Sequence, residues 1–138
     1  MSQLVEFLYP APARRTAGGI VRWWEHRRLP YNLFVGGAGL LSLGYVGLLQ
    51  TAVWGSAPGP TLLFPVAAFG VGANVCYALG PLVEIAAEKA FGRRLLPVGP
   101  MLYRMGLTFS VGLALLPSLI ATAAAVVYTV GRLFGLIG

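Results

Sequence analysis

Residues 32–54 read NLFVGGAGLLSLGYVGLLQTAVW and contain no charged side chain. A helix needs about 20 predominantly apolar residues to cross the hydrocarbon core of a bilayer, and this stretch supplies them. Residues 55–83 and 105–131 also contain no Asp, Glu, Lys or Arg. Hydrophobic residues make up 57% of the chain and charged residues 10%, whereas ordinary globular domains are roughly 25% charged. Composition therefore excludes a small soluble domain and indicates lipid surroundings.

The sequence predicts an all-α membrane protein in which residues 1–138 form a single integral membrane domain. We expect three transmembrane helices, near residues 32–53, 62–83 and 104–130. The segment GSAPGPT at 55–61 separates the first two, because its prolines and glycines break helices. A basic segment, residues 1–31, precedes the first helix, and a basic loop, residues 84–103, joins the second to the third.

Basic residues are distributed unevenly around these predicted helices. Five arginines precede the first helix, and four more basic residues lie between the second and third: Lys89, Arg93, Arg94 and Arg104. Nine of the ten basic residues thus fall on one side, and only Arg132 follows the third helix. Basic residues in short loops stay in the cytoplasm, so we expect a cytoplasmic N-terminus and a C-terminus outside. Nine arginines against one lysine are typical of a GC-rich bacterial genome. We therefore expect a protein of the bacterial inner membrane.

The segment before the first apolar run, RRTAGGIVRWWEHRRLPYN at 14–32, gathers five arginines, two tryptophans and the only histidine. On a helix, Ile20 and Trp24 share one side while Arg22 and Glu25 share the other. This pattern predicts a short N-terminal interfacial helix that leads into the first span. Glu25 is spaced to pair with an arginine three residues away on either side.

Aromatic and basic residues at the cytoplasmic side are expected at the level of the lipid headgroups. These are Arg22, Trp23, Trp24, Arg27, Arg28, Tyr31, Arg93, Arg94 and Arg104. The isoelectric point near 10.1 then indicates anionic lipid headgroups as partners and not nucleic acid, since basic residues near such a surface are attracted to it.

Small residues recur every four positions in two of the predicted spans. The second span carries Ala68, Gly72, Cys76 and Gly80, and the third carries Gly106, Ser110, Ala114, Ser118 and Thr122. The first span has one such pair, Ala38 and Ser42. Because small residues let membrane helices approach closely, we expect the second and third helices to pack along their rows. The alternative is that membrane helices are simply rich in Gly and Ala.

Two residues inside the predicted spans are expected to perturb them. Asn74 lies near the middle of the second span, where an unpaired amide is unfavourable. We expect it to face protein, either as a hydrogen-bonding contact between helices or as part of a polar path. Pro117 lies inside the third span and should free the carbonyl of Leu113, which bends the helix.

Four polar residues are candidates for an inner-face polar cluster: Glu25, Asn32, Glu84 and Glu88. Paired carboxyl groups can perform acid–base chemistry or hold a metal. Glu84 and Glu88 lie one helical turn apart, and we interpret them as ion-pair partners of nearby basic residues. We therefore predict no catalytic residue, metal or cofactor. The single cysteine, Cys76, excludes a disulfide framework.

Two segments together, WWEHRRLPYN at 23–32 and NVCYALGPLVE at 74–84, resemble small multi-pass bacterial membrane proteins of uncharacterised function. Those proteins share the patterns W-E-x-x-R-x-x-Y-N and N-x-x-Y-x-L-G-x-x-x-E. The resemblance covers about a sixth of the chain and has no named family or activity attached. It implies that a set of polar and aromatic residues acts together: Glu25, Tyr31, Asn32, Asn74, Tyr77 and Glu84.

The sequence favours a non-enzymatic membrane protein that acts by helix packing. It would associate with copies of itself or serve as an accessory subunit of a larger membrane complex. One alternative is a homo-oligomeric pore or small-solute conduit lined by Asn74 and the Ser/Thr row of the third helix. A less favoured alternative is a membrane enzyme that uses Glu84 and Glu88.

Overall fold

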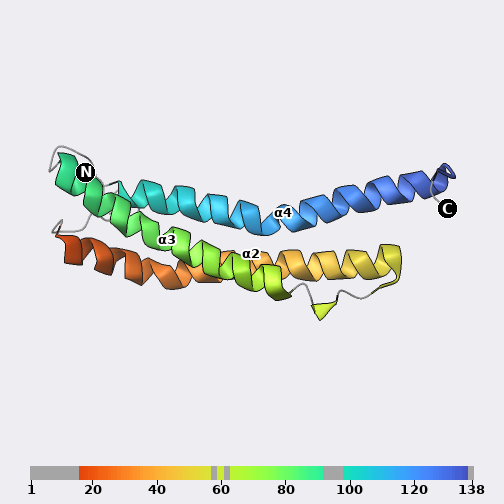
Figure 1. The fold of residues 1–138 in the computed structure, drawn as a ribbon, viewed down its shortest axis with the longest axis horizontal. Helices are drawn as coiled ribbons and strands as arrows, with labels where there is room; N and C mark the ends of the chain where they lie inside the picture. Colours follow the sequence, from red (N-terminus) through yellow and green to blue (C-terminus); the bar gives the residue numbers. More distant parts are fainter. Residues whose placement is uncertain (1–15, 57–58, 61–62, 92–97, 137–138) are drawn as a thin grey trace, which may run out of the picture.

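A computed structural model of the chain describes residues 16–56, 59–60, 63–91 and 98–136. They form three long helices: α2 (Ala17–Trp54), α3 (Leu63–Phe91) and α4 (Gly99–Leu133) (Figure 1). Each helix is long and apolar enough to cross a membrane. The prediction of an all-helical protein with three helices long and apolar enough to span a membrane is confirmed.

The three helices lie lengthwise beside one another. The start of α2, the end of α3 and the start of α4 meet at one end of the molecule (Figure 1). Thus α2 and α4 run parallel, and α4 packs chiefly along α2, while α3 runs antiparallel to both. The end where α2 and α4 begin is called the inner end below, and the opposite end the outer end.

Local sequence sets the ends of the helices. The hydroxyl of Thr16 caps α2 by accepting a hydrogen bond from the backbone N–H of Gly19 at 3.2 Å. At the other end Gly55 adopts the left-handed conformation with φ of 66°, which a residue without a side chain enters most easily. Gly135 closes α4 in the same way, with φ of 65°.

The helices extend further toward the inner end than the sequence predicted. The expected interfacial helix is not a separate element, because α2 continues through Pro30 without a break. Pro30 leaves the carbonyl of His26 without its helical donor, but His26 is exposed, so water can satisfy this group. The expected loop at 84–103 is partly helical too, since α3 continues to Phe91 and α4 begins at Gly99. Arg93 and Arg94 lie outside the described residues.

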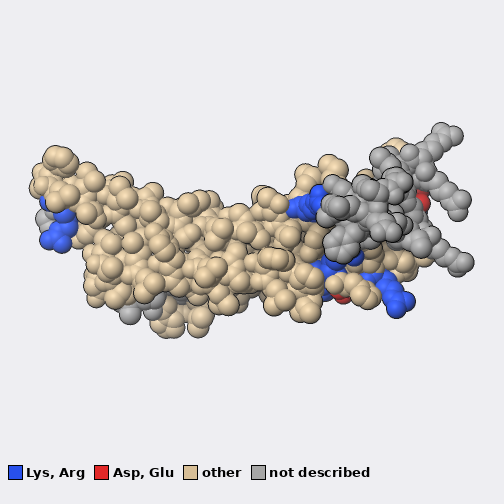
Figure 2. All heavy atoms as spheres, turned by 180° about the vertical axis from the view of Figure 1, so that it is seen from behind, with Lys and Arg blue, Asp and Glu red and all other residues tan. Residues whose placement is uncertain are grey.

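The helix α2 is longer than the hydrocarbon core of a bilayer is thick. The 38 residues of α2 extend about 57 Å at 1.5 Å per residue, whereas the hydrocarbon core is about 30 Å thick. The charge-free part of α2 begins at Leu29, so the turns before it extend beyond the hydrocarbon. Figure 2 shows charged side chains near this end and basic atoms at the opposite end, where Arg132 lies in the last turn of α4, with uncharged residues over most of the surface between them.

Figure 1 shows α4 bent near its middle, where Pro117 lies inside the helix. Proline has no backbone N–H, so the carbonyl of Leu113 receives no helical hydrogen bond. The predicted effect of Pro117 on the third helix agrees with this shape.

Candidate functional site

Four aromatic side chains from all three helices gather near the inner end and form what we call the aromatic cluster: Trp24, Tyr31, Tyr77 and Tyr103. The rings of Trp24 and Tyr77 lie 5.3 Å apart at 77°, and those of Tyr31 and Tyr77 lie 4.5 Å apart. Tyr103 stands edge-on to Trp24 at 6.2 Å. Edge-to-face ring pairs of this kind add stability beyond the area that they bury.

Helical spacing brings these rings together. On α2 the buried residues Ile20, Trp24, Tyr31 and Val35 follow intervals of four, seven and four, which keeps them on one face. On α3 the buried residues Ala73, Tyr77 and Glu84 follow the same rule. Trp24 and Tyr31 are only 2% exposed, so these two rings are among the best-buried side chains of the described residues.

Trp24 and Glu84 form a buried hydrogen bond between α2 and α3. The indole Nε1 of Trp24 donates to Oε2 of Glu84 at 2.7 Å, and Glu84 is 7% exposed. The indole N–H is a donor only, so the carboxyl oxygen is its natural partner. A buried polar group without such a partner would be strongly destabilising.

The carboxyl group of Glu84 also lies at the start of α4. A Cβ added to Gly99, the first residue of α4, would overlap both carboxyl oxygens of Glu84. The N-terminus of α4 has no acidic residue in its first turn and no side-chain cap from Val98. Because a helix N-terminus carries partial positive charge, Glu84 is placed where its oxygens are favoured.

Two glycines permit these close contacts. A Cβ at Gly80 would come within 3.0 Å of the Trp24 ring, and a Cβ at Gly99 would overlap the carboxyl group of Glu84. Any larger residue at either position would displace the Trp24–Glu84 pair. Gly80 was predicted as a helix-packing residue, whereas Gly99 was not singled out by its sequence pattern.

The tyrosine hydroxyls of the aromatic cluster tie the helices together. Tyr77 donates to the carbonyl of Trp24 at 2.6 Å, which joins α3 to α2. Tyr31 donates to the carbonyl of Ala73 at 3.3 Å and shares a hydrogen bond of 2.7 Å with the hydroxyl of Ser110. One tyrosine of α2 therefore contacts both α3 and α4.

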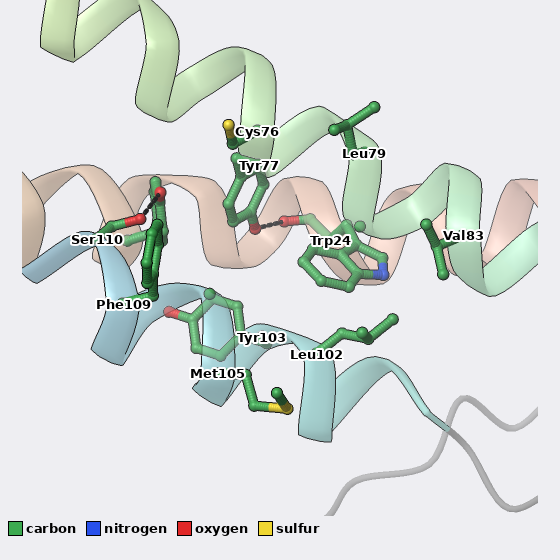
Figure 3. A pocket seen from close by; sticks show the side chains of 13 residues that line it. Trp24, Cys76, Tyr77, Leu79, Val83, Leu102, Tyr103, Met105, Phe109 and Ser110 are labelled. Atoms are coloured by element: carbon green, nitrogen blue, oxygen red, sulfur yellow. Dashed lines mark hydrogen bonds between the residues drawn. The ribbon is translucent and has the colours of Figure 1, made fainter. Parts of the chain in front are cut away.

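A groove of about 260 Å³ opens between α3 and α4 at this level. Figure 3 shows Trp24 reaching from α2 into the gap, with Cys76 and Leu79 on the α3 side and Met105 and Phe109 on the α4 side. The groove is lined almost entirely by apolar atoms. It is suited to apolar chains and offers little for a charged substrate.

Charged side chains surround the aromatic cluster at its inner rim. Glu25 pairs with Arg28 at 2.9 Å, as the spacing predicted. The guanidinium of Arg27 lies 3.8 Å from the centre of the Trp23 ring, and that of Arg28 lies 5.6 Å from the centre of the Tyr77 ring. Such partly exposed pairs add little stability on their own, but they hold positive charge beside the aromatic cluster.

The residues expected at the headgroups divide into two groups. Trp24 and Tyr31 are buried and face protein instead of lipid. Trp23, Arg27 and Arg28 are half-buried, and Arg22 and Arg104 are exposed. The sequence pattern did not distinguish the rings that pack against another helix from those that remain partly exposed.

Two of the small residues of α4, Ser110 and Thr122, share hydrogen bonds with tyrosines of α2. Ser110 and Ala114 are buried, and Thr122 is half-buried and shares a hydrogen bond of 2.9 Å with the hydroxyl of Tyr45 on α2. Ser118 is half-buried and donates to the carbonyl of Leu115 within its own helix. Gly106 is exposed, with no atom within 4 Å of an added Cβ.

The small residues of α3 behave differently. Gly80 contacts Trp24 of α2, whereas Ala68, Gly72 and Cys76 are exposed. Cys76 and Gly80 line the groove between α3 and α4, as do Gly106 and Ser110 of α4. At this level a groove separates the two rows that were expected to draw α3 and α4 together.

Asn74 bonds within its own helix, and three of the four residues predicted to form an inner-face polar cluster are exposed or half-buried. The amide nitrogen of Asn74 donates to the carbonyl of Gly70 on its own helix at 3.0 Å. Asn32 and Glu25 are exposed, and Glu88 is half-buried. No group of three or more His, Cys, Asp or Glu side chains is placed to hold a metal among the residues that the structure describes.

The structure brings together three of the six residues that the resemblance linked. Tyr31, Tyr77 and Glu84 meet around Trp24. Trp24 also lies in the first of the two resembling segments, and Gly80 lies in the second. The two segments thus supply both sides of the contact between α2 and α3.

No protein-family model, curated protein or solved structure matches the chain. The function therefore has to follow from the contacts and charges of the chain itself.

Proposed function

We propose that this chain is a non-enzymatic, multi-pass protein of the bacterial inner membrane that acts by helix packing. It associates with copies of itself or serves as an accessory subunit of a larger membrane complex. The observation that carries the proposal is the exposure of α3. Of its 29 residues, the buried ones are Ala73, Tyr77 and Glu84.

The exposed face of α3 has the composition of a helix-packing surface. Ala68, Gly72 and Cys76 are exposed and spaced by four residues, and a Cβ at Gly72 would meet nothing within 4 Å. In lipid, association depends on close packing and hydrogen bonds more than on the hydrophobic effect. A face of small residues therefore lets another helix approach the α3 backbone closely.

The distribution of charge supports the proposed orientation, with the N-terminus in the cytoplasm and the C-terminus outside. The described basic residues lie at the inner end, apart from Arg132 at the other (Figure 2). Positive charge at one end favours that end on the cytoplasmic side, next to anionic headgroups.

Native mass spectrometry of the detergent-extracted chain tests the proposal. We expect assemblies larger than one chain, made of this chain alone or with other membrane subunits. Gly72→Leu should shift them toward the monomer, because its side chain would hold a second helix away. Val75→Leu is the matched control, since Val75 is already 59% exposed and bulky. A wild-type protein that is monomeric at every concentration would contradict the proposal.

The alternatives have less support from the contacts. The polar groups that would line a pore are engaged inside the monomer: Asn74 with Gly70, Ser110 with Tyr31, and Thr122 with Tyr45. An enzymatic role for Glu84 is disfavoured because its carboxyl group is 7% exposed and is bound by an indole.

A further inference from the structure

A second cavity lies between all three helices, on the outer side of the aromatic cluster, and we call it the Ser42 cavity. Its volume is about 320 Å³. Ser42 of α2, Phe69 of α3, and Leu113 and Pro117 of α4 are among the residues that line it. Apart from the hydroxyl of Ser42, its lining side chains are apolar.

The hydroxyl of Ser42 is buried and has no hydrogen-bond partner among the described residues. Ser42 is only 3% exposed, so an unpaired hydroxyl there is unfavourable. Serine and threonine hydroxyls in membrane helices often donate a hydrogen bond to the backbone carbonyl four residues earlier. Thr51 on the same helix does this, donating to Gly47 at 2.9 Å, whereas Ser42 does not.

The opposite wall of the cavity offers an acceptor. Pro117 leaves the carbonyl of Leu113 without its helical donor, and both residues line the cavity. One residue with an unpaired hydroxyl and one residue with an unpaired backbone carbonyl therefore line an otherwise apolar cavity. Small-molecule sites have this character: they are mostly apolar, with few polar groups that fix orientation.

The depth of the cavity restricts what can occupy it. Ser42 lies near the middle of the uncharged stretch 32–54. The hydrocarbon core is about 30 Å thick, so the ester carbonyls of phospholipids remain about 15 Å away and only their methylene groups reach this depth. A ligand that pairs with Ser42 at this depth has to carry its oxygen on a molecule that is itself soluble in the hydrocarbon.

We propose that the Ser42 cavity binds the ring of a lipid-soluble quinone or quinol. The Ser42 hydroxyl donates to a ring carbonyl of the quinone, and the freed carbonyl of Leu113 accepts a hydroxyl of the quinol. A volume of about 320 Å³ is more than twice that of a cavity of about 150 Å³ that holds benzene. Val66 and Leu113 at the rim are 40% and 42% exposed, which leaves an opening for a hydrocarbon tail.

Binding of a decyl-tailed benzoquinone to the full chain in phosphatidylcholine nanodiscs tests this inference, with empty nanodiscs subtracted. We expect one saturable site per chain. Ser42→Ala should raise Kd about fivefold, the effect of losing one net hydrogen bond. Ser118→Ala is the matched control, because that hydroxyl bonds within its own helix, and it should leave Kd unchanged.

A second pair of variants tests the location. Gly39 lines the cavity and has open space around it, so Gly39→Leu should fill the site and abolish saturable binding. Gly44→Leu is its control, since Gly44 is exposed and outside the lining. The inference is overturned if binding does not exceed that of empty nanodiscs or if Ser42→Ala binds as tightly as the wild type. Equal affinity for decylbenzene, which has no oxygen, would also overturn it.

Discussion

The hydrogen bond between Trp24 and Glu84 gives the sharpest prediction, because it joins two helices through two buried side chains. Trp24→Phe keeps an aromatic ring but removes the N–H that reaches Oε2 at 2.7 Å. Glu84 would remain buried at 7% exposure without this donor. Hydrogen bonds contribute about 1 kcal/mol on average, and interhelical bonds in membranes contribute about 0.6 kcal/mol with a maximum near 1.7. With the smaller ring included, we expect Trp24→Phe to lower the free energy of unfolding by about 2–3 kcal/mol.

A double-mutant cycle separates the hydrogen bond from the loss of packing. The single variants Trp24→Phe and Glu84→Leu and their combination are unfolded by titration with SDS in mixed micelles, and helical circular dichroism is recorded. We expect a coupling energy of about 1–2 kcal/mol, because the double variant no longer leaves a buried carboxyl group unpaired. A coupling below about 0.5 kcal/mol would refute the reasoning. Trp54→Phe is the control, since Trp54 is 40% exposed at the outer end and its replacement should change stability by less than about 1 kcal/mol.

Three further predictions concern packing and orientation. Gly80→Ala should lower the free energy of unfolding by about 1–3 kcal/mol, because its Cβ overlaps a buried indole ring; Gly70→Ala, which has open space, should not, and equal effects of the two would count against this close contact. Tyr31→Phe should lower the same quantity by about 1–2 kcal/mol, because one hydroxyl loses two partners; an unchanged SDS midpoint would show that those bonds add nothing. In a cysteine-free background, a membrane-impermeant maleimide should label Ser56→Cys in intact cells and Ser2→Cys only after lysis; labelling of Ser2→Cys in intact cells would reverse the orientation.

The sequence was sufficient to predict the spans because they depend on composition alone. A stretch of 23 uncharged residues at 32–54 has few stable arrangements other than a helix in lipid. Helix ends were less accurate, since Pro30 and Glu84 looked like boundaries but lie inside α2 and α3. Propensity and charge do not decide where a helix stops when another helix covers the next turn.

The candidate site was harder to predict because its key contact joins residues 60 positions apart. Trp24 lies in a basic and aromatic segment of the kind expected at lipid headgroups. Nothing in that segment shows that α3 and α4 cover its ring. The two resembling segments did carry a signal, since Tyr31, Tyr77 and Glu84 come together. Gly99 carried none, because its role depends on a carboxyl group from another helix.

The two halves of α3 are held to the rest of the molecule to different degrees. In its inner half, Ala73, Tyr77 and Glu84 form hydrogen bonds with α2. Residues 63–72 make no side-chain hydrogen bond to another helix among the described residues, while α2 and α4 remain joined at the outer end by Tyr45 and Thr122. Regions with few buried contacts open at lower free energy than the rest of a fold. We therefore expect the outer half of α3, which is held to the core cluster through Phe69 and forms one wall of the Ser42 cavity, to open at lower free energy than the inner half. This same half carries the exposed residues Ala68 and Gly72 that we propose as a packing surface.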